Sequence, residues 1–295
     1  MLDEYRANLA RQTAAARNDP RTTADLINLA LTEMDENAAW DAVVLLHFRG
    51  TRDVFDAAKS LCASDCPQEK TLGANILGQL GVPDRSFPDE CVAVLMKLLK
   101  AESADCALEA ACIALGHLHG EELSGRAVEL LCNLKDHADA GVRYAVAFAL
   151  AGLSDNLTIK TLIELSSDED PIVRDWATFA LGAQTDADTP EIRQALCARL
   201  SDSDEITRGE ALAGLARRKD ERVVEPLINE LSSYHEAEYG SYRLEAAEQL
   251  ADARLLPVLL QLKESAPAQD NELEKVIRIM CLSKTGWTTT ARSNS

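Results

Sequence analysis

Two neighbouring side chains, Asp175 and Trp176, are candidates for contact with a protein partner. They stand in a predicted helix, and Glu210 and Glu245 follow Trp176 at steps of 34 and 35 residues. Carboxylates steer and orient cations, and a tryptophan buried on binding can anchor an interface. Because this column of positions tolerates glutamate, we expect it to face solvent. Packing of Trp176 against the neighbouring repeat is the alternative, and the sequence leaves both open.

The segment 232–242, SSYHEAEYGSY, is a second candidate contact surface. It lengthens the turn between two predicted helices and gathers three of the five tyrosines with two glutamates: Tyr234, Glu236, Glu238, Tyr239 and Tyr242. Tyrosines beside acids on a protruding loop suit the recognition of a basic protein. A loop folded back on the helices is the alternative.

Residues that enzymes use for covalent or metal chemistry do not fall into recognisable arrangements. The sequence has no phosphate-binding loop, no GxGxxG after a strand, no HExxH and no GxSxG. The five histidines have no neighbouring nucleophile, and the eight cysteines include no CxxC pair. We therefore predict no enzymatic activity and no catalytic, cofactor-binding or metal-binding residue.

Most cysteines fit an apolar helical pattern, where a reduced thiol acts as a small hydrophobe. These are Cys91, Cys112, Cys132, Cys197 and Cys281. The start of the chain lacks the apolar core of a signal peptide, and no stretch is long and apolar enough to span a bilayer. Together these observations predict a cytoplasmic protein.

The charge of the chain restricts its partners. With 49 acidic and 30 basic residues, the formal net charge is −19. Phosphate backbones and anionic lipids repel such a chain, so nucleic acid and membrane are not expected partners. A basic protein is the natural complement, although solvation alone is the alternative explanation of the charge.

The helices that position these side chains share a seven-residue frame, usually a basic residue followed seven positions later by a leucine, which recurs six times. Its last residues are leucines spaced 38, 35, 31, 34 and 35 residues apart, and the frames are Lys70/Leu77, Leu108/Leu115, Arg143/Leu150, Arg174/Leu181, Arg208/Leu215 and Arg243/Leu250. Small residues between base and leucine, with apolar residues three and four apart, indicate amphipathic helices. A period in the thirties is typical of stacked helix pairs. We predict an all-α, right-handed α-solenoid of about seven helix pairs with helical caps.

The frame also suggests what its arginines do. Arg143, Arg174, Arg208 and Arg243 could form a ladder that faces a ligand. We favour a structural role, in which each base reaches the acidic turn of the adjacent repeat. Acids four or five residues upstream are available for this: Asp139, Asp170, Asp204 and Glu238.

The acidic turns at 168–170, 186–188 and 202–205 stand where helices begin. Carboxylates there offset the helix dipole. Repeated along one edge, they would also add to a negative strip that steers a basic partner.

Domain boundaries follow from the periodicity. Two helices near 4–18 and 23–33 precede the regular repeats, so residues 1–34 are predicted to be N-terminal capping helices. The repeat solenoid is predicted over 35–265 and a C-terminal capping helix over 266–282. The tail 283–295 has no periodicity and is predicted to be flexible.

The repeats resemble the HEAT-like class named after phycobilisome lyases, whose unit reads roughly V-R-x-x-A-x-x-A-L-G. VRYAVAFALAGL, VRDWATFALGA and ITRGEALAGLA carry this pattern, whereas Leu108 and Glu69-Lys70 depart from it. The stretches FRGTRDVF, GANILGQL, LAGLARRKDERV and EAAEQLADARLLPVL further resemble the bacterial YibA-like family. That resemblance implies an immunity protein associated with Rhs polymorphic toxins and type VI-type secretion, with a toxin domain as partner.

Two other functions remain open on the residues alone. A general adaptor or scaffold for a cytosolic protein makes the same surface predictions. HEAT-like repeats also occur in bilin lyases and DNA glycosylases, but a glycosylase needs a basic groove, which the net charge of −19 opposes.

Overall fold

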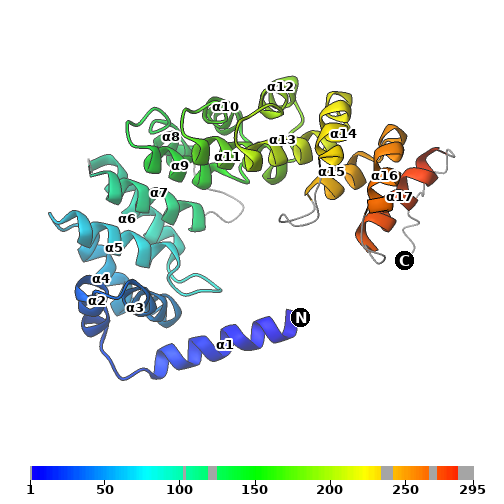
Figure 1. Cartoon of the computed structure of the whole chain (residues 1–295). Coiled ribbons are helices and arrows are strands. Elements are labelled where there is room, and N and C mark those ends of the chain that lie inside the picture. The colour runs from blue at the N-terminus through cyan, green and yellow to red at the C-terminus, as the bar shows by residue number, and fades with distance from the viewer. Residues whose placement is uncertain (1, 102–103, 119–124, 234–241, 266–270, 285–295) are drawn as a thin grey trace, which may run out of the picture. The chain divides into compact units, whose positions relative to one another are not determined.

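Helices make up the regular structure of the chain. The computed structural model describes residues 2–101, 104–118, 125–233, 242–265 and 271–284. Every regular element in these stretches is a helix, and none of them combines the length and apolar character required to cross a bilayer. The chain forms two compact units, residues 1–150 and 151–295 (Figure 1). The predicted all-α solenoid of helix pairs is confirmed.

Unit 1 stacks its helices in pairs. The first helices of successive pairs lie side by side, and the second helices form another layer against them. The first helices are α3 (Glu36–Arg49), α5 (Pro67–Gly78), α7 (Asp105–Leu118) and α9 (Ala140–Leu150), and the second helices are α4 (Arg52–Cys62), α6 (Pro88–Ala101) and α8 (Gly125–Cys132). Two further helices precede them, α1 (Leu2–Asn18) and α2 (Thr23–Thr32).

Unit 2 repeats this arrangement. Its first helices are α11 (Pro171–Phe179), α13 (Glu205–Arg217), α15 (Tyr242–Leu250) and α17 (Asn271–Lys284). Its second helices are α10 (Asn156–Leu165), α12 (Pro190–Arg199), α14 (Val224–Ser232) and α16 (Leu256–Ser265). Three short elements complete the unit: the π-helical turn η1 (Ala180–Gln184) and the 3-10 turns η2 (Glu221–Val223) and η3 (Ala253–Leu255).

The leucines of the seven-residue frame form the core of both units. Five of the six are fully buried and Leu250 is 7% exposed; the five are Leu77, Leu115, Leu150, Leu181 and Leu215. Alanines on the same helices, such as Ala111 and Ala145, are also buried, so neighbouring first helices approach closely. Burying each leucine contributes about 2 kcal/mol, which is why this position of the repeat keeps an apolar side chain.

The closest approach in unit 2 requires glycine. A Cβ atom on Gly214 of α13 would lie 2.6 Å from the Cα of Gly182 in η1. Any side chain at Gly214 would therefore push the two helical segments apart.

Of the five cysteines expected in apolar helical patterns, four are buried or half-buried and one is exposed. Cys91, Cys112 and Cys132 are buried and Cys197 is half-buried, and all eight cysteines are free thiols. Cys281 is exposed, because it lies on the outward side of α17 while Val276 and Met280 of that helix are buried. The assignment of Cys281 to the core was wrong.

The predicted domain boundaries differ from the division into units. Helices α1 and α2 fall within 1–34, and α17 covers most of 266–282. Their role as caps stays a prediction. Of the predicted flexible tail, residues 283 and 284 continue α17, and 285–295 lie outside the described residues.

Candidate functional site

Three of the four frame arginines donate hydrogen bonds to the turns that precede their own helices. Arg143 and Arg243 are each only 7% exposed. Arg143, Arg174 and Arg208 each donate hydrogen bonds to two backbone carbonyls five and six residues upstream. Arg174 also pairs with Asp202 at 2.9 Å, in the turn before the next first helix. The predicted tie between adjacent repeats is confirmed at Arg174.

The acids that were expected to meet these arginines have another role. Asp170 and Asp204 are N-caps that accept hydrogen bonds from the first amides of α11 and α13. Asp139 accepts from the amide of Val142 in the same way. A carboxylate at this position reaches the free amides of its own helix, so the arginine finds its carboxylate elsewhere. The predicted helix-end role is confirmed for Asp170 and Asp204. For Asp139 only a contact with a frame arginine was expected, and Glu238 lies outside the described residues.

Three carboxylates of unit 2 form a row across its first helices, called here the acidic row: Asp175 on α11, Glu210 on α13 and Glu245 on α15. Asp175 and Glu210 are half-buried, and Glu245 is exposed. One oxygen of Asp175, Oδ1, is buried and accepts no hydrogen bond from the part of the chain that the structure describes. The first helices lie side by side here, which brings the three acids near one another.

Burial and like charge make two members of the acidic row, Asp175 and Glu210, costly to ionise. Burial raises the pKa of Asp175 to about 6, and the Asp204 carboxylate adds to the rise. Burial also raises the pKa of Glu210 to about 7, with further repulsion from Asp175 and Glu245. A cation placed against the row would relieve both costs, because it favours the charged form of each acid.

Replacing Glu210 by glutamine is expected to stabilise the protein at pH 8. The folded-state pKa of about 7 lies above the unfolded value of about 4.3. The folded state therefore binds more protons between these values, so stability falls as pH rises through this window. After allowance for partial exposure, Glu210→Gln should gain about 1–2 kcal/mol at pH 8.

Urea unfolding at pH 8 and pH 5 measures this difference. Most of the gain should disappear at pH 5, where Glu210 is already protonated in the folded state. Glu245→Gln is the matched control, because Glu245 is exposed, and it should change stability little at either pH. An equal effect of Glu210→Gln at both pH values would contradict the assigned pKa.

The predicted column that contains Trp176 does not face solvent throughout. Ala145 is fully buried, and Glu210 is half-buried. Trp176 itself is half-buried, and its ring meets Phe179 edge-on with 5.8 Å between ring centroids. The physical reason is the close spacing of first helices, which covers one flank of each position. Trp176 as an anchor for a partner stays a prediction.

Tyr242 belongs to a helix and packs within unit 2. It is the first residue of α15, and its ring covers the Cα face of Gly209. The Arg243 guanidinium lies 4.4 Å from the ring centroid, and burial raises the pKa of the Tyr242 hydroxyl. The hydroxyl lies 3.4 Å from carboxylates of both Glu205 and Glu230. Tyr242 therefore packs against the helices, as in the alternative of a segment folded back on them. The other predicted contact residues of this segment lie outside the described residues: Tyr234, Glu236, Glu238 and Tyr239.

Unit 1 contains a groove that the sequence did not single out. It has a volume of about 530 Å³ and lies between α2, α3, α5 and α7. Trp40 and Leu31 on its walls are 48% and 39% exposed, and Glu33 and Glu36 line it as well. We call it the Trp40 groove. Trp40 is thus an exposed tryptophan beside acids, the arrangement that the sequence predicted for Trp176.

The seven-residue frame could have located Trp40. Ala39 and Leu46 are seven residues apart and stand 31 residues before Lys70 and Leu77, so they extend the frame by one repeat. Leu46 is fully buried, as the frame requires. Trp40 then occupies the position of Asp175 in its repeat. The missing base at Ala39 hid this signal.

The stacked helix pairs form a fold that is typical of protein-binding modules. A model of HEAT repeats matches residues 127–192, and the chain is an all-α solenoid of HEAT repeats. Protein YibA of Escherichia coli strain K12 is 31% identical over 217 residues, which cover 73% of this chain and 76% of YibA. The chain belongs to the YibA family.

Solved structures agree with this assignment. The X-ray structure of Escherichia coli YibA matches with a TM-score of 0.74 and 26% identity, over 91% of this chain and 95% of that one. Importin beta matches with a TM-score of 0.51 and 14% identity, over 92% of this chain and 42% of its own. The likeness to importin beta is one of fold alone.

Proposed function

We propose that the chain is an immunity protein that binds a basic toxin domain and blocks access of the toxin to its substrate. HEAT-repeat folds are typical of protein-binding modules, and such solenoids generally present surfaces rather than catalytic centres. The resemblance to YibA-like proteins implies an association with Rhs toxins, and this implication guides the choice of partner. In this proposal the protein has no catalytic activity of its own.

The acidic row is the observation that carries the proposal. Two of its carboxylates, Asp175 and Glu210, are half-buried where ionisation is costly, and Asp175 Oδ1 lacks a donor among the described residues. An arginine or lysine from a partner would supply the missing donor and offset the repulsion between Glu210 and its neighbours. The net charge of −19 would speed the encounter with a basic domain.

Apolar anchors complement the charges in each unit. Trp176 lies next to Asp175, and Trp40 is half-exposed beside Glu33 and Glu36. Buried aromatic anchors surrounded by polar residues contribute most of the affinity in many interfaces. Each unit therefore offers one aromatic side chain with acids close by.

Mixing the purified chain with the toxin domain encoded beside its gene tests the proposal. We expect a complex that persists through gel filtration at moderate salt, and protection of cells that express the toxin. Trp40→Ala should weaken the complex by about 30-fold if the groove receives an anchor from the toxin. Leu260→Ala is the control, because Leu260 is 45% exposed on the second-helix layer.

The absence of both a complex and protection would overturn the proposal. A stable complex with a host protein, formed while the toxin is ignored, would favour a general adaptor instead. A complex that forms but is unaffected by Trp40→Ala would leave the immunity function in place and remove the groove from the interface.

A further inference from the structure

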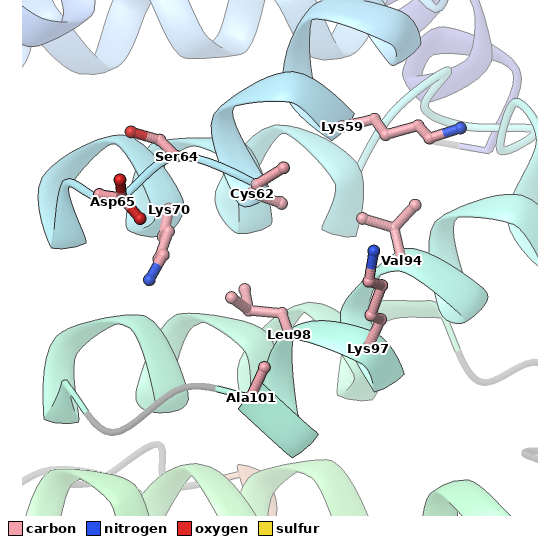
Figure 2. A pocket seen from close by; sticks show the side chains of 10 residues that line it. Lys59, Cys62, Ser64, Asp65, Lys70, Val94, Lys97, Leu98 and Ala101 are labelled. Atoms are coloured by element: carbon pink, nitrogen blue, oxygen red, sulfur yellow. The ribbon is translucent and has the colours of Figure 1, made fainter.

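A basic cavity lies in unit 1, apart from the acidic row and the Trp40 groove. It has a volume of about 300 Å³ and is bounded by α4, α5 and α6 (Figure 2). Its wall is apolar where Cys62, Val94 and Leu98 meet. Lys59, Lys70 and Lys97 also line it, one from each of the three helices.

Three lysines around one cavity are unexpected in a chain of net charge −19. Elsewhere in the protein, bases such as Arg174 and Arg193 are held by carboxylates within 3 Å. Lys59 and Lys97 are exposed, and neither forms an ion pair within 4 Å among the described residues; Glu90, which pairs with Arg52, interacts with Lys59 only through its charge at longer range. The ammonium group of Lys97 points toward α4 across the opening, and Lys70 lines the opposite side (Figure 2). Asp65 is the one acid among the lining residues that the structure describes.

The cavity also offers a neutral hydrogen-bond donor. Ser64 lines it, and its Oγ accepts a hydrogen bond from the Cys66 amide at 3.1 Å. The hydroxyl proton of Ser64 is therefore available to an acceptor in the cavity. Burial raises the pKa of the Cys62 thiol to about 12, so the wall carries no negative charge there.

We propose that this cavity binds a small organic anion, a carboxylate or phosphate group carried on an apolar body. Ammonium groups bind such anions as point charges, and the wall of Cys62, Val94 and Leu98 accepts the apolar part. A cavity of about 300 Å³ is at the small end of ligand pockets. Nucleic acid does not fit this description, because the net charge repels a long polyanion.

Methyl NMR of leucine- and valine-labelled protein, titrated with phenyl phosphate, tests the site. The Val94 and Leu98 methyl signals are expected to shift in a saturable manner. Inorganic phosphate should bind more weakly, because it leaves the apolar wall uncovered, and phenol should not bind at the same concentration. The double variant Lys59→Gln/Lys97→Gln should lower the affinity for phenyl phosphate by about tenfold.

Lys160→Gln is the matched control, since Lys160 is exposed on α10 in unit 2 and should leave the affinity unchanged. Equal shifts with phenol would show an apolar site without anion preference and overturn the proposal. Absence of shifts at Val94 and Leu98, or wild-type affinity in the double variant, would also overturn it. None of these outcomes depends on whether the toxin complex forms.

Discussion

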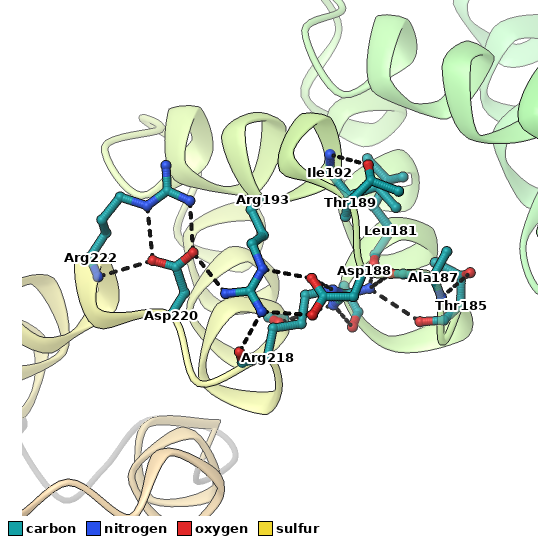
Figure 3. A network of polar contacts seen from close by, with 12 residues as sticks. Leu181, Thr185, Ala187, Asp188, Thr189, Ile192, Arg193, Arg218, Asp220 and Arg222 are labelled. Carbon is teal, nitrogen blue, oxygen red and sulfur yellow. Dashed lines mark hydrogen bonds and ion pairs between the residues drawn. The ribbon is translucent and has the colours of Figure 1, made fainter.

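Replacing Arg218 by methionine is expected to lower the free energy of unfolding by about 3–5 kcal/mol. Arg218 is 8% exposed and follows α13 directly. Its two terminal nitrogens donate hydrogen bonds of 2.8–3.2 Å to five backbone carbonyls (Figure 3), those of Leu181, Gly182, Thr185, Ala187 and Gly214. Methionine fills similar space but leaves buried carbonyls without donors, and each such acceptor costs free energy.

The effect should be concentrated in the connection from η1 to α12. This connection includes the extended residues 185–189, which contribute few helical hydrogen bonds of their own. Asp188 also pairs with Arg193 at 2.6 Å, so the variant should loosen that contact too. Thermal or urea unfolding measures the loss, and amide hydrogen exchange locates it.

Arg254→Met is the control for this substitution. Arg254 is exposed and, in the described structure, forms an ion pair only with Asp252, the N-cap residue of η3, at 2.6 Å. Exposed pairs of this kind contribute about 0.5 kcal/mol. If Arg218→Met lowers the free energy of unfolding by less than about 1 kcal/mol, water must donate to these carbonyls in place of the guanidinium, and the prediction is contradicted.

Arg218 also shows where prediction from the sequence stops. The frame found the first helices because the leucine at its end is buried in every repeat, as at Leu77 and Leu215. Arg218 stands outside the frame, three residues after Leu215, and stabilises a π-helical turn that has no periodic signature. Its role depends on carbonyls 31–37 residues away, which no local pattern reveals.

The sequence predicted which acidic residues stand on successive first helices, but it did not predict how deeply each of them is buried. The sequence placed Asp175, Glu210 and Glu245 in successive first helices, and the structure has them there. The raised pKa values of Asp175 and Glu210 arise from burial between closely spaced helices, and the sequence does not contain that spacing. The same spacing half-buries Trp176, and Trp40 was missed because Ala39 lacks the base that marked the other repeats.

Glu245→Lys is expected to slow association with the basic partner about tenfold at low salt, a prediction that rests on the proposed function. Glu245 is exposed in the acidic row, so reversing its charge changes the local field without removing buried contacts. Stopped-flow or surface binding kinetics at two salt concentrations would measure the effect. Glu264→Lys carries the same charge change on α16, in the second-helix layer, and should slow association much less.

The pH dependence of binding separates the acidic row from general electrostatic attraction. Asp175 and Glu210 have pKa values raised to about 6 and about 7, so they lose charge as pH falls from 8 to 5.5. Most other acids of the chain stay ionised over this range. The affinity should therefore fall toward pH 5.5, and Glu210→Gln should flatten the profile. Two results would together contradict this assignment. In one, Glu210→Gln leaves the pH profile of the affinity unchanged; in the other, Glu245→Lys and Glu264→Lys slow association equally. The binding surface would then lie elsewhere on the protein.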